Sequence, residues 1–360
     1  MNEHRYVAIM AGGIGSRFWP QSRVSYPKQF LDILHTGKTL IQWTYERFLH
    51  FIPEENIYIV TSEEYVDIVK QQLPNALVDN ILAEPSRKNT APCIAWISYR
   101  LFQKDPDATL IIAPSDHLIT DNDAFRSICE KALGFVNEVK AFVTLGITPT
   151  NPNTGYGYIQ HEPTAVADNI YKVKTFTEKP NLELAKTFIA SGDFLWNAGI
   201  FVWSVKNIIT AFEHYQPEMA EVFDAEKEHF NTAEEQKAIE RIYPLCTNIS
   251  IDYAIMEKSD EVYVIPSSFG WSDLGTWNSA YDNLEKDYLG NAVAGKHVIV
   301  IDATNTMISI PDDKLAVLQG LDDFIVVDTA DVLLICKREK EQDIKQFVAE
   351  VRRYKGDSYL

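Results

Sequence analysis

The first 150 residues alternate between short apolar runs and longer segments of mixed polarity. The runs are a few residues long and end at turn residues, which is typical of buried strands. They are Tyr6–Met10, Asn56–Val60, Thr109–Ala113 and Ala141–Leu145. The segments between them place apolar residues at helical spacing, as in Leu40–Phe51 and Pro92–Phe102. Strands that alternate with helices predict an α/β fold with a doubly wound, mostly parallel sheet that is covered on both faces.

The pattern becomes polar and helical between Val205 and Arg241. Its charge-rich part, "DAEKEHFNTAEEQKAIER", predicts a solvated helix face, and we assign no chemistry to it. In a doubly wound sheet, ligands bind beyond the carboxyl ends of the strands. The loops that follow the apolar runs are therefore the first places to look for a site.

After about Gly290 the pattern changes to closely spaced β runs, "HVIVID", "TMISI", "LAVLQG", "FIVVDT" and "VLLICK". These runs predict a small all-β module, which ends in an amphipathic helix over Glu341–Arg353. We therefore expect one domain over residues 1–289 and a second over 290–360. The strands of the second are too short to bury a sizeable core alone, so the rest of the chain, another subunit or both must cover its apolar residues.

Composition narrows the possible partners. The chain has 360 residues, 33 Lys+Arg and 51 Asp+Glu, which gives a formal charge of −18. Such a charge disfavours non-specific contact with nucleic acid or an anionic membrane. The four cysteines are scattered without a CxxC pair, so neither a zinc site nor a disulfide framework is indicated. No apolar run approaches the ~18 residues of a membrane span, and no signal peptide is apparent, so we expect a soluble, cytoplasmic protein.

The loop after the first apolar run has the composition of a phosphate cradle. Gly12, Gly13 and Gly15 follow it directly, and glycines let backbone N–H groups approach phosphate oxygens. The loop fits neither the Walker pattern nor G-x-G-x-x-G. A tight structural turn is the alternative interpretation. Arg17 and Lys28 favour the cradle, because a fork-shaped cation and a point charge suit the oxygens of a triphosphate.

The stretch "AGGIGSRFWPQSR...YPKQF" resembles the signature loop of sugar-nucleotide pyrophosphorylases, and most closely that of the mannose-1-phosphate guanylyltransferase family. Further motifs of that family follow in order as "EPSRKNTAP", "PSDH", "GYGYI", "FTEKP", "LWNAGIF", "SIDYAIMEK" and "GWSDLGTW". Two departures are conservative: Lys88 stands where arginine is frequent, and Ala198 where serine is common.

The resemblance implies a Rossmann-like nucleotidyltransferase fold with a left-handed parallel β-helix tail that contributes to a homodimer. It implies that GMP passes from GTP to α-D-mannose 1-phosphate, giving GDP-mannose and pyrophosphate, by in-line displacement with Mg²⁺. The sugar phosphate is its own nucleophile and is already anionic, so the lack of a Ser/His/Asp or Cys/His set is expected.

The resemblance also assigns the phosphate and metal residues. Arg17 and Lys28 would bind the triphosphate and act in catalysis. Asp116 follows the apolar run Thr109–Ala113, Asp273 lies between two tryptophans, and both resemble the Mg²⁺ ligands of the family. The alternative for each aspartate is that it caps a turn.

For the guanine base, the resemblance points to Glu84, Asn89 and Thr90, although Asn89 could instead cap the helix that begins near Pro92.

For the sugar phosphate, the resemblance points to Gly157, Glu178, Lys179 and Asn197. A surface ion pair is the alternative for Glu178 and Lys179, and a turn is the alternative for Gly157 and Asn197.

Three other functions remain open on the sequence alone. The first is the same reaction with another nucleotide or sugar 1-phosphate, because a few loop contacts decide that choice. The second is a non-catalytic subunit that senses sugar nucleotides, which the presence of all four expected catalytic residues disfavours. A dinucleotide-dependent oxidoreductase is weaker still, for lack of the G-x-G-x-x-G spacing.

Overall fold

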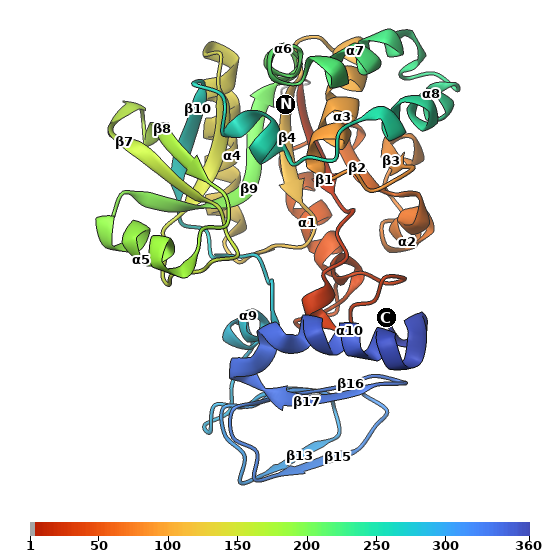
Figure 1. Cartoon of the computed structure of the whole chain (residues 1–360), viewed down its shortest axis with the longest axis vertical. Helices are drawn as coiled ribbons and strands as arrows, with labels where there is room; N and C mark the ends of the chain where they lie inside the picture. Colours follow the sequence, from red (N-terminus) through yellow and green to blue (C-terminus); the bar gives the residue numbers. More distant parts are fainter. Residues whose placement is uncertain (1–3) are drawn as a thin grey trace. The chain divides into compact units, whose positions relative to one another are not determined.

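The computed structural model describes residues 4–360 and divides into two compact units (Figure 1). Unit 1 comprises Met1–Gly12, Tyr45–Pro114 and Ile119–Trp271. Unit 2 comprises Gly13–Thr44, Ser115–Leu118 and Ser272–Leu360. The chain passes between them at helix α1 (Leu40–Leu49), at the short strands β5 (Leu118–Ile119) and β11 (Trp271–Ser272), and in the glycine-rich loop. The predicted boundary at residues 289 and 290 stays a prediction.

Unit 1 is built on a nine-stranded sheet with the order β3-β2-β1-β4-β9-β6-β10-β8-β7. The strands are β1 (Arg5–Met10), β2 (Ile57–Ser62), β3 (Ile81–Glu84), β4 (Thr109–Pro114), β6 (Phe142–Ile147), β7 (Tyr158–Ala167), β8 (Ile170–Thr177), β9 (Phe194–Ser204) and β10 (Val262–Ser267). Strands β3, β2, β1 and β4 pair in parallel, as do β6 and β10, whereas β7, β8 and β9 pair antiparallel. The predicted α/β fold with a mostly parallel central sheet is confirmed.

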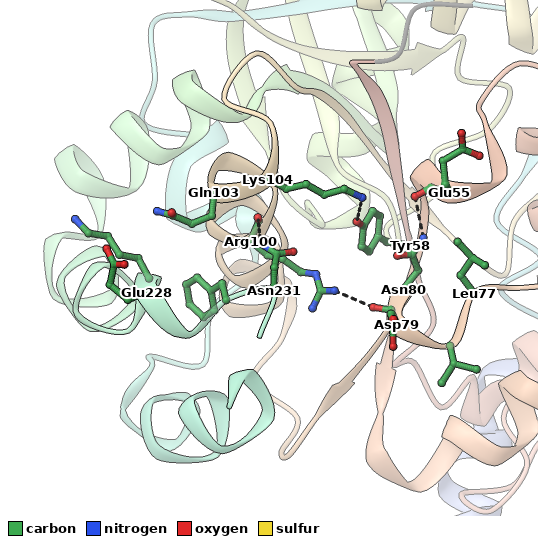
Figure 2. A pocket seen from close by; sticks show the side chains of 13 residues that line it. Glu55, Tyr58, Leu77, Asp79, Asn80, Arg100, Gln103, Lys104, Glu228 and Asn231 are labelled. Carbon is green, nitrogen blue, oxygen red and sulfur yellow. Dashed lines mark hydrogen bonds between the residues drawn. The ribbon is translucent and has the colours of Figure 1, made fainter. Parts of the chain in front are cut away.

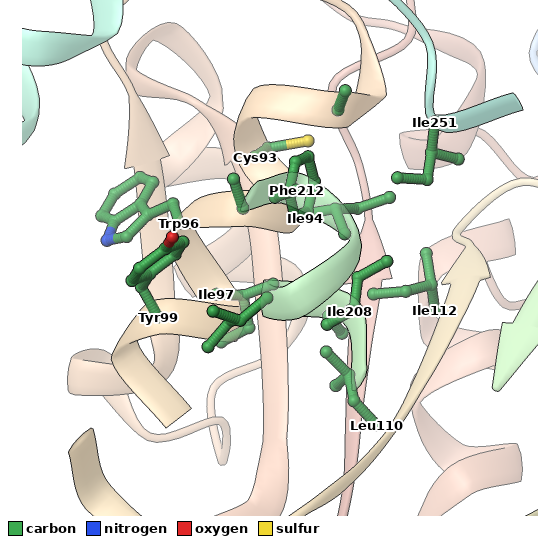
Figure 3. Packing of buried hydrophobic residues seen from close by; sticks show 14 of the residues in the cluster. Cys93, Ile94, Trp96, Ile97, Tyr99, Leu110, Ile112, Ile208, Phe212 and Ile251 are labelled. Atoms are coloured by element: carbon green, nitrogen blue, oxygen red, sulfur yellow. The ribbon is translucent and has the colours of Figure 1, made fainter. Parts of the chain in front are cut away.

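Helices cover both faces of this sheet. They are α2 (Val66–Gln72), α3 (Thr90–Lys104), α4 (Asn122–Glu138), α5 (Leu182–Ser191), α6 (Val205–Tyr215), α7 (Pro217–Ala225) and α8 (Glu235–Ile242). Figure 3 shows the core on the α3 and α6 side, where Ile94 of α3 and Ile208 and Phe212 of α6 belong to one buried cluster with Leu110 and Ile112 of β4. Leu110 and Ile112 face this core together because alternate residues of a strand point to the same side.

The segment predicted as a solvated helix face is not wholly solvated. Glu235 of α8 is buried, and its carboxylate accepts hydrogen bonds from Trp96 Nε1 at 2.7 Å and Arg100 Nη1 at 2.5 Å. A buried carboxylate needs such partners, and they lie far away in the sequence, so the local charge pattern could not indicate them. The helical assignment of the segment is confirmed, and its full solvation was wrong.

Unit 2 contains the predicted all-β tail. Its strands are β12 (Ala292–Ala294), β13 (Val298–Ile301), β14 (Met307–Ser309), β15 (Ala316–Gln319), β16 (Phe324–Asp328) and β17 (Leu333–Lys337), and its helices are α9 (Trp277–Asn283) and α10 (Ile344–Lys355). Strands β12, β14 and β16 stack in parallel and so do β13 and β15, while β17 adds antiparallel to β16. Successive strands of this kind form the rungs of a β-helix.

The core of unit 2 combines the tail with the segment after the glycine-rich loop. Phe18, Trp19, Ile33 and Leu40 belong to one buried cluster with tail residues such as Met307. Helix α10 joins the cluster through Ile344, and Phe347, Val348 and Val351 pack against it. The apolar stripe predicted for the C-terminal helix is therefore used inside unit 2.

Two further observations concern the described part of the chain as a whole. Along residues 4–360, no helix is both long enough and apolar enough to cross a membrane. All four cysteines are buried free thiols.

Candidate functional site

The glycine-rich loop has a conformation that requires glycine at position 15. Gly15 has φ of +65°, which is the left-handed region, and it precedes the short 3₁₀ turn η1 (Ser16–Phe18). A Cβ at this position would overlap Cβ of Lys28. Gly13 is exposed with open space where a Cβ would point, and its carbonyl accepts from Gln29 Nε2 at 2.9 Å. The loop therefore presents bare backbone beside Lys28.

Lys28 connects three distant segments of unit 2. Its side chain is buried, and Nζ donates to Oδ2 of Asp116 at 3.0 Å and to the backbone carbonyl of Asp273 at 2.7 Å. The same ammonium lies 5.8 Å from the centre of the Phe18 ring. The structure thus brings together three of the four residues expected to act in catalysis.

The Asp116 carboxyl is kept ionised by this arrangement. Burial by itself would raise its pKa, but the Lys28 ammonium and then His117 outweigh that effect, so the pKa is lower than usual. Nε2 of His117 lies 3.9 Å from Oδ1 of Asp116. Asp116 is therefore a partly exposed carboxylate with a fixed orientation.

Asp273 shows the turn-capping contact that was its alternative interpretation. Its Oδ1 accepts from the backbone N–H of Gly275 at 3.0 Å, and Ser272 Oγ accepts from that of Leu274 at 3.2 Å. An aspartate in such a turn keeps further lone pairs on its carboxylate. The turn contact and a metal ligand are therefore compatible, and the metal role stays a prediction.

The side chains available as metal ligands fit Mg²⁺ better than a metal ion whose ligands all come from the protein. Among residues 4–360 there is no group of three or more His, Cys, Asp or Glu side chains placed to hold an ion. Magnesium typically uses one or two carboxylates and takes its other ligands from phosphate oxygens and water. Asp116 and the Asp273 segment, joined through one ammonium, supply that number of carboxylates.

Arg17 is half-buried, and its Nε is enclosed without a hydrogen-bond partner among the described residues. It lies on η1, directly after the loop.

In unit 1, three of the residues predicted to bind the sugar phosphate, Gly157, Glu178 and Asn197, lie close to one another. Asn197 of β9 donates its backbone N–H to the carbonyl of Gly157 at 2.8 Å. Its Oδ1 accepts from Thr144 Oγ1 at 3.0 Å, and its Nδ2 donates to Oδ1 of Asp252 at 3.0 Å. Asn197 is thus held on both sides by strand and loop contacts.

Gly157 lies where Glu178 passes close to the backbone. A Cβ at Gly157 would overlap Oε2 of Glu178 and would lie 3.3 Å from Cβ of Asn197. Close approach therefore explains the glycine. Glu178 is largely buried and pairs with the exposed ammonium of its neighbour Lys179, which is the ion pair named as their alternative interpretation. Their contacts to a sugar phosphate stay predictions.

Asp252 contacts Asn197 and was not among the predicted site residues, although it lies within the quoted motif "SIDYAIMEK". Burial and then the nearby Glu178 raise its pKa to about 6. Two carboxyls beside one amide give a group of hydrogen-bond acceptors, and the Asp252 carboxyl takes up a proton as the pH falls towards 6. The motif itself was the only available signal.

Glu84 is buried rather than presented to solvent. The hydroxyl of Tyr243 donates to its Oε1, and its Oε2 lies 3.1 Å from where a Cβ on Gly12 would be. Burial raises its pKa to about 7, and the hydrogen bonds from Tyr243 and Cys93 offset only part of that rise. Its predicted contact with a base stays untested.

Asn89 and Thr90 both take part in starting α3. Asn89 is its N-cap, with φ of +64°, and its side chain accepts from the N–H of Thr90. Oγ1 of Thr90 accepts from the N–H of Ile251 at 2.9 Å. The capping role was the stated alternative for Asn89. Nearby, Lys88 donates to the carbonyls of Pro244 and Cys246.

A separate hollow of about 620 Å³ opens elsewhere on unit 1 (Figure 2). Its floor includes Tyr58, over which Arg100 lies 5.8 Å from the ring centre, and Arg100 donates to the carbonyl of Asp79 at 2.9 Å. None of the residues predicted for the site lines this hollow.

The residues predicted for the site therefore lie in both units, in one group in unit 2 and two clusters in unit 1. In unit 2 the group is Gly13, Gly15, Arg17, Lys28, Asp116 and Asp273. In unit 1 one cluster is Gly157, Glu178, Lys179, Asn197 and the unpredicted Asp252, and another is Gly12 with Glu84.

Known proteins resemble the chain over nearly all of its length. Residues 6–288 match the nucleotidyl transferase family, and residues 296–351 match the MannoseP isomerase/GMP-like beta-helix domain. The mannose-1-phosphate guanylyltransferase of Escherichia coli K12 is 34% identical over 358 residues, which are 96% of this chain and 73% of the relative. The alginate biosynthesis protein AlgA of Pseudomonas fluorescens is 35% identical over 347 residues, covering 95% of this chain and 70% of the relative.

A solved structure shares the architecture. A protein of Thermus thermophilus, described as a mannose-1-phosphate geranyltransferase, superposes with a TM-score of 0.87 at 28% identity and covers 97% of this chain and 99% of its own. Because the nucleotidyl transferase model matches most of the chain and these curated relatives are about one-third identical to it over nearly its whole length, we conclude that the chain belongs to the mannose-1-phosphate guanylyltransferase family of nucleotidyltransferases.

Proposed function

We propose that this nucleotidyltransferase transfers GMP from GTP to α-D-mannose 1-phosphate and releases pyrophosphate. The observation that carries the proposal is the contact of Lys28 Nζ with both the Asp116 carboxylate and the Asp273 carbonyl, beside the bare backbone at Gly15. Relatives at about one-third identity that are named mannose-1-phosphate guanylyltransferases support the choice of nucleotide and sugar.

The proposed reaction needs no protein nucleophile. A phosphate oxygen of the sugar 1-phosphate forms a bond to the α-phosphorus of GTP. The bond from that phosphorus to the oxygen bridging the β-phosphorus breaks, and its electron pair leaves with pyrophosphate. The protein's contribution is positioning and charge neutralisation, and held reactants can gain roughly 7–11 kcal/mol from proximity alone.

In this proposal, Gly13 and Gly15 offer backbone N–H groups to the triphosphate while Arg17 and Lys28 neutralise it. Asp116 and Asp273 would hold Mg²⁺, which supplies charge neutralisation on the phosphates when bound. Lys28 has a second effect on this chain: its ammonium keeps the Asp116 carboxyl deprotonated and oriented. A deprotonated carboxylate is the form that binds a metal ion.

In unit 1, the acceptors Glu178 and Asp252 and the amide of Asn197 would bind sugar hydroxyls, and Lys179 would meet the sugar phosphate. Glu84, Asn89 and Thr90 would lie beside the guanine base of the nucleotide. Glu84 and Asn89 already form hydrogen bonds within the protein. In this proposal they therefore shape the loop that binds the guanine base rather than contact the base themselves.

The test is a coupled pyrophosphate-release assay on the full chain with Mg²⁺. GTP, ATP, UTP and dTTP are each paired with mannose, glucose and galactose 1-phosphates. We expect GTP with mannose 1-phosphate to give the highest kcat/KM. Preference for another pair would identify a different pyrophosphorylase of the same fold, and binding of GDP-mannose without turnover on any pair would identify a sensing subunit.

We also propose that the protein is a homodimer that works in the cytoplasm. The buried free thiols suit a reducing compartment. Ile299 and Val317 of β13 and β15 are half or more exposed, so an apolar surface remains on the β-rich tail after α10 has been packed inside unit 2. Sedimentation of the full chain as a monomer at micromolar concentration would refute the dimer.

A further inference from the structure

We propose that Lys345, in the first turn of helix α10, is a phosphate-binding residue that contacts the same oligophosphate as Arg17. This inference rests on the proposed function, and it gives the C-terminal tail a direct part in binding nucleotide or pyrophosphate. The ligand class is an oligophosphate, either the triphosphate of the nucleotide or the pyrophosphate product.

Packing fixes α10 beside the turn that bears Arg17. Helix α10 is in contact with η1, and Ile344, the neighbour of Lys345, lies in one buried cluster with Phe18, the neighbour of Arg17. Beyond the C-terminal end of α10, in the turn Gly356–Tyr359, the carbonyl of Tyr359 accepts from Trp19 Nε1 at 2.8 Å. The helix and the turn that follows it are therefore each anchored to this segment, so buried contacts set the position of Lys345 relative to Arg17.

Both cations lack an acidic partner among residues 4–360. Elsewhere in unit 2, by contrast, Lys28 pairs with Asp116, Arg23 with Asp331 and Arg338 with Asp323. Neither Arg17 nor Lys345 forms an ion pair with a described residue, and the Nε of Arg17 is buried without a hydrogen-bond acceptor.

The two charges act on each other. Arg17 is the largest cause of a lowered pKa at Lys345, followed by slight burial. Like charges held near each other are unfavourable in the free protein. An anion that contacts both would replace repulsion with two attractions, so this pair binds a multiply charged anion better than either cation alone.

The neighbouring loop indicates which anion this is. Arg17 follows Gly13 and Gly15, where exposed backbone suits phosphate oxygens, and a tri- or pyrophosphate has more charge than one arginine neutralises. A carboxylate ligand would need only one such cation. The formal charge of −18 disfavours a nucleic-acid backbone as the ligand.

The experiment measures pyrophosphate and GTP binding to the full chain by calorimetry, together with KM for GTP and for the sugar phosphate. The variants are Lys345→Gln, Lys345→Arg and, as the matched control, Lys355→Gln, which removes an exposed lysine about three turns further along the same helix. We expect Lys345→Gln to weaken pyrophosphate binding roughly tenfold, the change expected for one charge-assisted hydrogen bond. KM for GTP should rise similarly, KM for the sugar phosphate should change little, and Lys345→Arg should retain most of the affinity.

Thermal unfolding provides the readout that separates binding from a structural role. Because Lys345→Gln removes a repulsion, the Tm without ligand should not fall, whereas the rise in Tm caused by pyrophosphate should be smaller than in the unsubstituted protein. Unchanged pyrophosphate affinity in Lys345→Gln, or an equal loss in Lys355→Gln, would overturn the inference. Pyrophosphate binding is measured without sugar or guanine, so the inference can fail or stand independently of the proposed substrate pair.

Discussion

The ammonium of Lys28 lies 3.0 Å from Oδ2 of Asp116, and the side chain of Lys28 is buried. The same nitrogen bonds the carbonyl of Asp273 at 2.7 Å. One cation therefore positions both segments that are expected to supply carboxylates to a metal ion.

The first prediction concerns the strength of this ion pair. Lys28→Met would leave Asp116 partly buried without its cation, so we expect unfolding free energy at pH 7 to fall by about 1–3 kcal/mol. Lys296→Met, which breaks the exposed pair with Asp312, should lower it much less, because water screens an exposed ion pair. Urea denaturation measures both. Equal losses in the two variants would show that the Lys28 contact adds nothing beyond a surface pair.

The second prediction separates the turn role of Asp273 from its metal role. Asn can accept the same hydrogen bond from Gly275, so Asp273→Asn should keep the turn and the Tm. If the carboxylate holds Mg²⁺, kcat should fall by ~10²-fold or more, the scale of a lost electrostatic contact in catalysis. Turnover of the unsubstituted protein should stop when excess chelator removes divalent ions. Full turnover of Asp273→Asn would leave that residue with its turn contact alone.

The third prediction follows from the raised pKa of Asp252, which burial and Glu178 bring to about 6. A carboxyl with a raised folded-state pKa favours folding while it is protonated, and that contribution is lost as the pH rises from about 4 to about 6. Asp252→Asn removes the titration and keeps an acceptor for Asn197. Relative to the unsubstituted protein, this variant should therefore gain about 2–3 kcal/mol of unfolding free energy between about pH 4 and pH 7, since one pKa unit corresponds to about 1.4 kcal/mol.

The control for that comparison is Asp168→Asn, whose side chain is 89% exposed. Its stability difference over the same pH range gives the baseline against which that of Asp252→Asn is compared. The same pH dependence in both variants would mean that the Asp252 carboxyl has no raised pKa in the folded protein.

The fourth prediction uses the close approach at Gly157. In Gly157→Ala the new methyl group overlaps Oε2 of Glu178 and pushes that carboxylate away from Asn197. We expect KM for mannose 1-phosphate to rise roughly tenfold, the cost of displacing one hydrogen-bonding group, with KM for GTP little changed. Gly134→Ala, where a Cβ would meet nothing within 4 Å, is the matched control. A rise in KM for GTP alone would place Glu178 at the nucleotide instead.

Much of the local structure could be predicted from sequence because it depends on periodicity and on turn chemistry. The run Thr109–Ala113 is strand β4 (Thr109–Pro114), and the helical spacing of Pro92–Phe102 is helix α3 (Thr90–Lys104). The expectation that Asn89 could cap that helix followed from its place just before it, and the structure has that cap.

Contacts between distant residues were beyond the local pattern. Asp252 stands in a motif that resembled a family, but only the fold places its Oδ1 within 3.0 Å of Asn197 Nδ2. Glu235 sits in a run of charges and is nonetheless buried, because Trp96 and Arg100 supply its hydrogen bonds. Local charge density gave no sign of either partner.

The sequence by itself was enough to predict the alternation of strands and helices, the glycine-dependent turn at position 15 and the family. Each of these depends on residues that are close together in the chain. The tertiary structure decided which charges meet. Lys28 binds residues 88 and 245 positions away, and helix α10 packs beside the turn that follows the glycine-rich loop rather than keeping its apolar stripe free for another subunit. The physical reason is that the burial and pairing of charges depend on which surfaces the fold brings together. The periodic spacing of apolar residues along the chain does not specify those surfaces.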